Sequence, residues 1–145
     1  MMPTALDWLQ SLPRLSGEPG LDRMKALLAA LGDPQKRGRY VHIAGTNGKG
    51  SVCAMLASVL QAAGYRVGLN TSPHLVEFEE RIQVDGTPIA QEELAELVTR
   101  IRPAAESMEE HPTEFELITA MALVYFLERQ CDIVVLETGL GGALD

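Results

Sequence analysis

The stretch that decides the fold is Gly45-Thr46-Asn47-Gly48-Lys49-Gly50-Ser51. It follows a short apolar run from Tyr40 to Ala44 and precedes a helix-forming run from Val52 to Ala63. A glycine-rich turn between a strand and a helix presents unpaired backbone N–H groups, and the helix dipole favours negative charge there. Glycines let the backbone curl around an anion, and Lys49 can reach outer phosphates as a point charge. The stretch therefore predicts a phosphate-binding loop.

The strict P-loop pattern, G-x-x-x-x-G-K-[ST], is not matched, because Ile43 takes the place of the first glycine and Gly50 separates Lys49 from Ser51. The alternative interpretation is a glycine turn with an incidental lysine. The strand–turn–helix context favours the phosphate site, since a lysine at a helix N-terminus is unfavourable unless an anion offsets its charge.

Two further strands complete the core of the prediction. Gly64 ends the helix, Arg66 to Asn70 reads as the second strand, and Asp132 to Leu136 reads as a third strand that is buried on both faces. Strand, turn, helix and strand form a βαβ unit, so parallel pairing is expected. The sequence thus predicts an α/β, P-loop-containing fold with a mostly parallel sheet and flanking helices.

Glu137 follows the third strand, where it faces the same crevice as the loop after the first strand. A carboxylate there, with the hydroxyl of Ser51, suits magnesium, which takes oxygen ligands together with water and phosphate. The alternative, a solvated glutamate at a strand end, stays open.

The remaining pattern predicts helices and one hairpin. Asp85-Gly86 is a turn signal for the hairpin, Pro103 is expected to kink or split its helix, and Thr113 with Glu116 forms a capping box. The predicted helices cover residues 4–12, 21–31, 91–110 and 113–129, and the hairpin covers residues 81–89.

Composition narrows the function classes. The chain has 145 residues, of which 46% are hydrophobic and 22% charged, which is typical of a soluble globular domain. A net charge of −8 and a basic run of only Lys36, Arg37 and Arg39 argue against nucleic-acid binding. Neither a signal peptide nor a membrane span is predicted, so a cytoplasmic protein with reduced Cys53 and Cys131 is expected. His42 is expected to be a hydrogen-bonded core residue.

Four segments taken together resemble one family. They are HIAGTNGKGS at residues 42–51, TSPHL with the later ERIQVDG at residues 71–86, T-x-F-E at residues 113–116, and LETGLGG at residues 136–142. In this order they resemble folylpolyglutamate synthase/dihydrofolate synthase, a family of Mur-ligase-like ATP-dependent ligases. The resemblance spans nearly the whole chain.

The resemblance implies a role for each matching position. Lys49 is the implied catalytic residue, and Ser51, Ser72 and Glu137 would ligate Mg²⁺. The ATP phosphates would be held by Gly45, Thr46, Asn47, Gly48, Lys49, Gly50 and Ser51. The pteroate or folate site would be lined by Gly20, Thr71, Pro73, His74, Thr113, Glu114, Phe115, Glu116, Leu144 and Asp145. An aromatic face at Phe115 could stack on a flat pterin ring, although a helix Phe in the core is the alternative.

The implied activity is ATP-dependent addition of L-glutamate to dihydropteroate, to folylpolyglutamate, or to both. The implied partners are ATP, Mg²⁺, a pteroate or folate, and L-glutamate, with no nucleic acid, no membrane and a monomeric full-length protein. Ala143 stands where the family usually has Arg, which removes a cation near the site.

The resemblance also sets the expected domain organisation. Residues 1–145 would be the N-terminal part of the ATP-binding domain, so the chain is expected to be truncated, to lack a C-terminal glutamate-binding domain, and to be inactive by itself. The alternatives are a nucleotide-binding module without turnover and another Mur-type amide ligase. An ordinary P-loop kinase or GTPase is disfavoured by Ile43 and Gly50.

Overall fold

The computed structural model describes residues 8, 21–43, 49–71, 81–108 and 112–137 of the chain. The helix predicted for residues 4–12 lies outside this part, apart from Trp8. The structure confirms the α/β class. Its helices are α2 (Leu21–Ala30), the 3₁₀ helix η1 (Pro34–Arg37), α3 (Lys49–Ala62), α4 (Gln91–Glu106) and α5 (Glu114–Glu128). Its strands are β1 (Tyr40–Ile43), β2 (Val67–Asn70), β3 (Ile82–Val84), β4 (Thr87–Pro88) and β5 (Ile133–Glu137).

The five described strands form one mixed sheet in the order β1-β5-β2-β3-β4. β5 lies between β1 and β2 and is parallel to both. β3 pairs antiparallel with β2, and β4 pairs antiparallel with β3. The predicted hairpin is confirmed, with positive φ at both turn residues, 50° at Asp85 and 80° at Gly86. The Asp85 carboxylate also accepts a hydrogen bond from the Val67 amide at 2.8 Å, which fixes the hairpin to β2.

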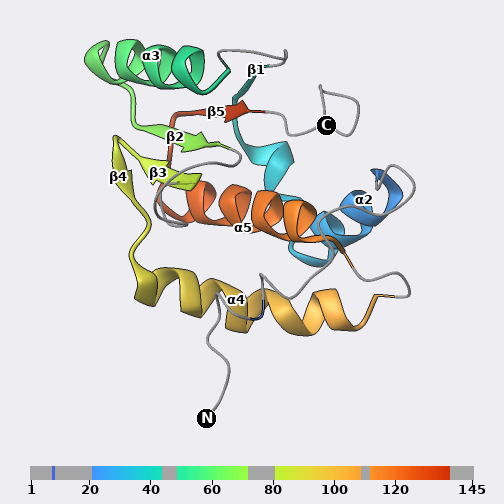
Figure 1. Ribbon diagram of the computed structural model, residues 1–145. Coiled ribbons are helices and arrows are strands. Elements are labelled where there is room, and N and C mark those ends of the chain that lie inside the picture. Colours follow the sequence, from blue (N-terminus) through green and yellow to red (C-terminus); the bar gives the residue numbers. More distant parts are fainter. Residues whose placement is uncertain (1–7, 9–20, 44–48, 72–80, 109–111, 138–145) are drawn as a thin grey trace.

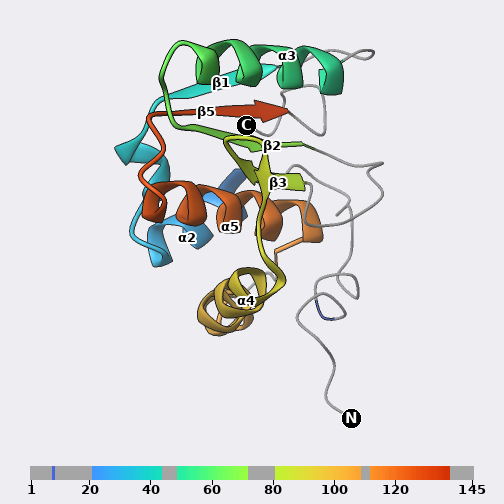
Figure 2. The same ribbon diagram turned by 90° about the vertical axis from the view of Figure 1, so that its left-hand side faces the viewer.

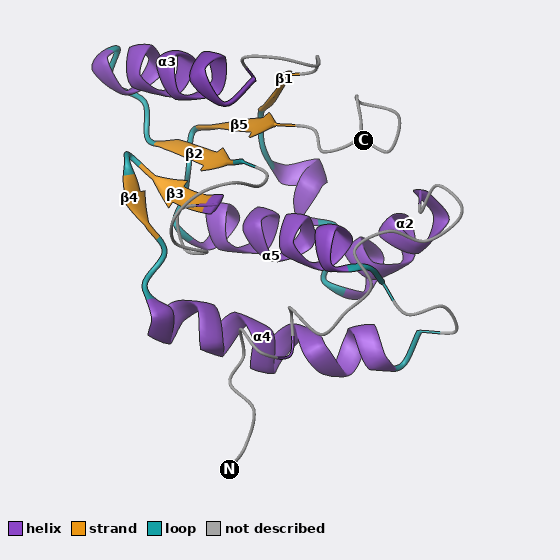
Figure 3. Ribbon diagram, in the orientation of Figure 1, coloured by secondary structure: helices purple, strands orange, loops and turns teal. Residues whose placement is uncertain are grey.

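The helices are divided between the two faces of the sheet. Of the described helices, α3 covers one face, while α5 and α2 pack below the other face and α4 lies beyond them (Figures 1 and 2). Figure 3 shows the same layers by secondary structure. Two clusters of buried residues correspond to this division. The larger cluster joins the sheet to α2, α4 and α5 and contains Phe126 at 1% exposure, and the smaller one joins Cys53 of α3 to Val67 and Val135.

Three local predictions need correction. β1 was expected to be buried, but it is the edge strand of the described sheet and only half-buried, with His42 exposed rather than in the core. Of the two outcomes expected at Pro103, a kink or a split, the split is wrong, because α4 continues through Pro103 to Glu106. α3 begins at Lys49, earlier than its apolar run predicted, so the second half of the glycine-rich stretch is already helical. None of the helices in the described residues is long and apolar enough to cross a membrane.

Candidate functional site

The three parallel strands β1, β5 and β2 all end at the same side of the sheet. This carboxyl edge is distinct from the edge strand β1. α3 starts at Lys49, shortly after β1 ends at Ile43, so its N-terminus lies at this edge. α5 runs back along the sheet and returns into β5 after a short turn, which places its first turn near the same edge (Figure 1). Two helix N-termini, the ends at which backbone N–H groups lack intrahelical partners, therefore lie at this edge.

Glu137 is the last residue of β5 and lies beside the end of β1. It is in register with Ile43 and is only 7% exposed. Neighbouring strands are about 4.8 Å apart, so the Glu137 backbone adjoins the point from which the chain leaves β1. Within the described ranges, no group of three His, Cys, Asp or Glu side chains could hold a metal ion. Any cation here would need further oxygen ligands from elsewhere.

The first turn of α5 is held by a reciprocal capping box. The Glu116 carboxylate accepts a hydrogen bond from the Thr113 amide at 2.9 Å, and the Thr113 hydroxyl accepts one from the Glu116 amide at 3.3 Å. Both residues are buried. The predicted capping box is thus confirmed, and these two side chains have a structural task whatever ligand they meet.

Glu114, the next residue in this turn, forms a buried ion pair with Arg81. The Arg81 Nη1 atom lies 3.4 Å from Glu114 Oε1, and the two side chains are 12% and 10% exposed. The Arg81 carbonyl accepts hydrogen bonds from the Thr71 amide and from Nδ2 of Asn70, each at 3.0 Å. One residue thereby joins the end of β2 to the start of α5.

Buried polar side chains are concentrated in this region. In the part of the chain that the structure describes, they are Asn70, Thr71, Thr113, Glu114, Glu116, Thr119 and Glu137. All of them lie at or just after the end of β2, at the end of β5, or in the first two turns of α5 and its cap, whereas the remaining core is apolar. The hydroxyl of Thr71 is buried without a hydrogen-bond partner among the described residues. Burying polar groups is costly, so their concentration at one edge marks it as the candidate site.

The structure places only some of the residues predicted from sequence. It brings Thr71, Thr113, Glu114 and Glu116 together, and it puts Glu137 at the same edge of the sheet. For Lys49, Gly50, Ser51 and Phe115 it describes the backbone position in a first helical turn. Gly20, Gly45, Thr46, Asn47, Gly48, Ser72, Pro73, His74, Leu144 and Asp145 lie outside the described residues.

Sequence reasoning missed Arg81 and Asn70 as members of this region. Asn70 had a usable signal, because it is a polar residue at the carboxyl end of a predicted buried strand. For Arg81 the sequence offered no signal beyond its place before a short strand, because its partner Glu114 is distant in sequence.

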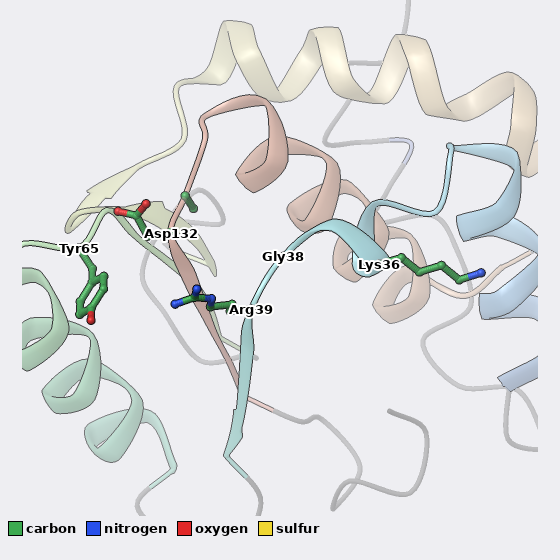
Figure 4. Close-up of a pocket in the computed structure, with 6 residues that line it drawn as sticks. Lys36, Gly38, Arg39, Tyr65 and Asp132 are labelled. Carbon is green, nitrogen blue, oxygen red and sulfur yellow. The ribbon is translucent and has the colours of Figure 1, made fainter.

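A hollow of about 470 Å³ lies at the opposite edge of the sheet, where β1 and β5 begin. Lys36, Gly38, Arg39, Tyr65, Cys131 and Asp132 line it. Figure 4 shows that the Lys36 side chain extends away from the other labelled side chains, so the positive charges of Lys36 and Arg39 do not point at a common position. Burial raises the pKa of the half-buried Cys131 thiol to about 11, with Asp85 adding to the effect, so it is protonated near neutral pH. None of the six residues that line this hollow is among those predicted to bind ATP, Mg²⁺ or a pteroate.

Comparison with known proteins gives close relatives along nearly the whole chain. The dihydrofolate synthase/folylpolyglutamate synthase of Bacillus subtilis is 48% identical over 146 residues, which covers 97% of this chain. The solved structure described as an FPGS-AMPPCP-folate complex superposes with a TM-score of 0.91 at 44% identity and covers 97% of the chain. Mycobacterium tuberculosis folylpolyglutamate synthase complexed with ADP matches with a TM-score of 0.87 at 37% identity over 95% of the chain.

These relatives are much longer. The chain spans 34% of the Bacillus subtilis relative and 36% and 32% of the two solved chains. No protein-family model matches the chain.

Proposed function

The chain belongs to the folylpolyglutamate synthase/dihydrofolate synthase family, as an N-terminal portion, and on this premise we propose that its parent protein is an ATP-dependent ligase. The ligase joins L-glutamate to dihydropteroate, to folylpolyglutamate, or to both. The observation that carries the proposal is the edge geometry: α3 begins at Lys49 directly beyond β1, and Glu137 is in register with the last residue of that strand. The relatives bound to AMPPCP and ADP support ATP as the nucleotide.

The N-terminus of α3 binds the phosphates in this proposal. Its free N–H groups and its dipole favour an anion, and Lys49 in the first turn adds a positive charge. Residues 45–51 hold the triphosphate as a unit, which keeps the γ-phosphorus in line with the incoming carboxylate. Such positioning and charge neutralisation account for most of the catalysis in phosphoryl transfer.

The reaction then proceeds in two steps. A carboxylate oxygen of the pteroate or folate attacks the γ-phosphorus of ATP, ADP leaves, and an acyl phosphate forms. The amine of glutamate attacks the acyl carbon, inorganic phosphate leaves as the C–O bond breaks, and the nitrogen loses a proton. The phosphorylation is needed because an unmodified carboxylate would have to expel oxide.

Mg²⁺ fits the residues present. Glu137 contributes one buried carboxylate at the edge, and magnesium commonly takes one or two carboxylates together with hydroxyls, water and phosphate oxygens. Ser51 and Ser72 would supply the hydroxyls. When bound, the ion would neutralise charge on the phosphate oxygens.

The acceptor site lies between the end of β2 and the first turn of α5. Thr71 offers a buried hydroxyl with no partner in the described part of the chain, which supports a hydrogen bond to substrate. Phe115 lies in the same helical turn as Glu114, where an aromatic face could stack on a pterin. Residues Gly20, Pro73, His74, Leu144 and Asp145 complete the proposed pocket.

We also propose that the chain is one part of a larger ATP-binding domain. On α3 the side chains of Val52, Met55 and Val59 are 49%, 68% and 64% exposed, although they share an apolar face. β1 is the edge strand of the described sheet, the position at which a sheet is extended by a further strand. Both features are expected if further polypeptide covers α3 and extends the sheet. The full-length protein is then proposed to be a cytoplasmic monomer that does not bind nucleic acid.

A second candidate applies to residues 1–145 alone. Because they span about a third of their relatives, the isolated chain is proposed to bind ATP–Mg²⁺ without turnover. Calorimetry with ATP–Mg²⁺ measures this binding, and amide formation by the isolated chain would contradict it.

The principal test uses the protein expressed from the complete reading frame. With ATP, Mg²⁺, L-glutamate and dihydropteroate or a tetrahydrofolate, we expect ADP, phosphate and the glutamylated product in equal amounts. Release of ADP only with a different acceptor, such as a muramyl substrate, would overturn the proposed function.

A further inference from the structure

The ion pair between Arg81 and Glu114 differs from the other ion pairs of the described residues. Its side chains are 12% and 10% exposed, whereas in the pair between Arg100 and Glu128 both are 45% exposed. A buried ion pair loses the hydration of both charges, and apolar residues of the same size are often equally stabilising there. Stability alone therefore does not account for a charged pair at this position.

The placement of Arg81 supplies another reason. Its carbonyl accepts the amide of Thr71 and Nδ2 of Asn70, and its guanidinium contacts Glu114. The two segments that it joins are the two walls of the proposed acceptor site, the end of β2 and the first turn of α5. A planar guanidinium has a fixed donor geometry, so it holds its partner with less freedom than an ammonium group.

We propose that Arg81 is a positioning residue, which fixes the separation of these two walls so that the pteroate or folate binds between them. The inference rests on the proposed function for its substrate. Arg81 itself does not need to touch the reacting atoms: its backbone is already bonded to the end of β2, and its guanidinium ties that backbone to Glu114 on the other wall. A displacement of about 1 Å between groups that bind one substrate can lower a rate by about a hundredfold.

Hydrogen exchange on the ligand-free protein tests the joint without any activity measurement. Arg81→Met keeps the carbonyl that accepts the Thr71 amide but removes the guanidinium contact to Glu114, so the amides of Thr71 and of residues 116–117 should exchange faster than in the wild type because the two segments are no longer tied together. Arg100→Met is the matched control. Arg100 of α4 pairs with Glu128 at the C-terminal end of α5, whereas Arg81 pairs with Glu114 at the N-terminal end of α5, so Arg100 lies outside the site. It should leave these amides unchanged. Unchanged exchange in Arg81→Met would overturn the proposal.

Kinetics on the protein from the complete reading frame separate positioning from mere stabilisation. Arg81→Met should raise KM for the acceptor by about tenfold or more while KM for ATP changes less than about twofold. Arg81→Lys should be intermediate, since it keeps the charge but loses the planar geometry. Equal changes in both KM values, or a similar change in Arg100→Met, would overturn the proposal.

The double variant Arg81→Met/Glu114→Met addresses the risk that one unpaired buried charge prevents folding. Removal of both charges should restore the melting temperature toward that of the wild type, yet the Thr71 amide should still exchange faster, a readout that does not depend on any contact between Glu114 and the substrate. Recovery of both properties would show a stabilising role only and overturn the inference. If the wild type itself does not glutamylate a pteroate or folate, the proposed function fails, while hydrogen exchange still decides whether Arg81 joins the two segments.

Discussion

Gly68 of β2 and Phe126 of α5 lie so close together that a Cβ atom on the glycine would fall 2.7 Å from two carbons of the aromatic ring. The ring is 1% exposed and belongs to the larger core cluster, so it has little room to move. The missing side chain at Gly68 is what lets α5 approach the sheet, and α5 carries the first turn that forms part of the candidate site.

Gly68→Ala should therefore lower the free energy of unfolding by about 1–3 kcal/mol through overpacking. Chemical denaturation of the isolated chain measures it. Adding Phe126→Leu should recover part of the loss, because the smaller side chain makes room, and the two changes should be non-additive. Full additivity would contradict the close contact.

The capping box at the start of α5 should add about 1 kcal/mol to the free energy of unfolding. Thr113→Ala removes the hydroxyl that accepts the Glu116 amide, and loss of such a cap costs about 0.5–2 kcal/mol. Glu116→Gln should cost much less, since glutamine also fits a capping box. Thr99→Ala is the control, because the exposed Thr99 hydroxyl only donates back to the Ala95 carbonyl within α4. Denaturation should leave this variant close to the wild type.

Lys49→Met in the full-length protein should lower kcat/KM by about 10²–10³-fold, the scale seen when one preorganised charge contact is lost. The melting temperature should change little, since the residue lies in the first turn of α3. Lys36→Met is the control, because the Lys36 side chain is 73% exposed at the other edge of the sheet. Equal activity in Lys49→Met and the wild type would remove the phosphate role.

Glu137→Gln should raise the Mg²⁺ concentration needed for half-maximal activity, because an amide is a weaker ligand than a carboxylate for this ion. A magnesium titration at saturating ATP measures the shift. Glu92→Gln, an exposed acid in the first turn of α4, should leave the titration unchanged. An identical titration in both variants would show that Glu137 does not bind the metal.

Cys131 should react slowly with iodoacetamide near neutral pH. Its folded pKa of about 11 exceeds the ordinary value of 9.0, so between these two pH values the native thiol stays largely protonated while an unfolded one is ionised. The labelling rate of the native chain should rise about tenfold per pH unit between pH 7 and 10. The linked stability is fully present below pH 9 and is lost as the pH rises through 11. Cys53, at 0% exposure, should label only on unfolding. A labelling rate that levels off near pH 9 would contradict the raised pKa of Cys131.

Local patterns in the sequence determined most elements of the fold. The Asp85-Gly86 turn, the Thr113–Glu116 capping box and the α/β class were all predicted and are confirmed. They depend on interactions between residues a few positions apart, or on apolar periodicity, both of which can be read from a single chain. The glycine-rich stretch likewise predicted a helix N-terminus, and α3 begins within it.

Only the tertiary structure decided the order of the strands and the partners across the sheet. The sequence predicted parallel strands but not that β5 lies between β1 and β2, so it could not show β1 at an edge or His42 exposed. Arg81 and Glu114 meet only because β3 and α5 converge at one edge. Pairings of this kind depend on long-range packing among many residues that are distant in sequence, so a local sequence pattern does not predict them.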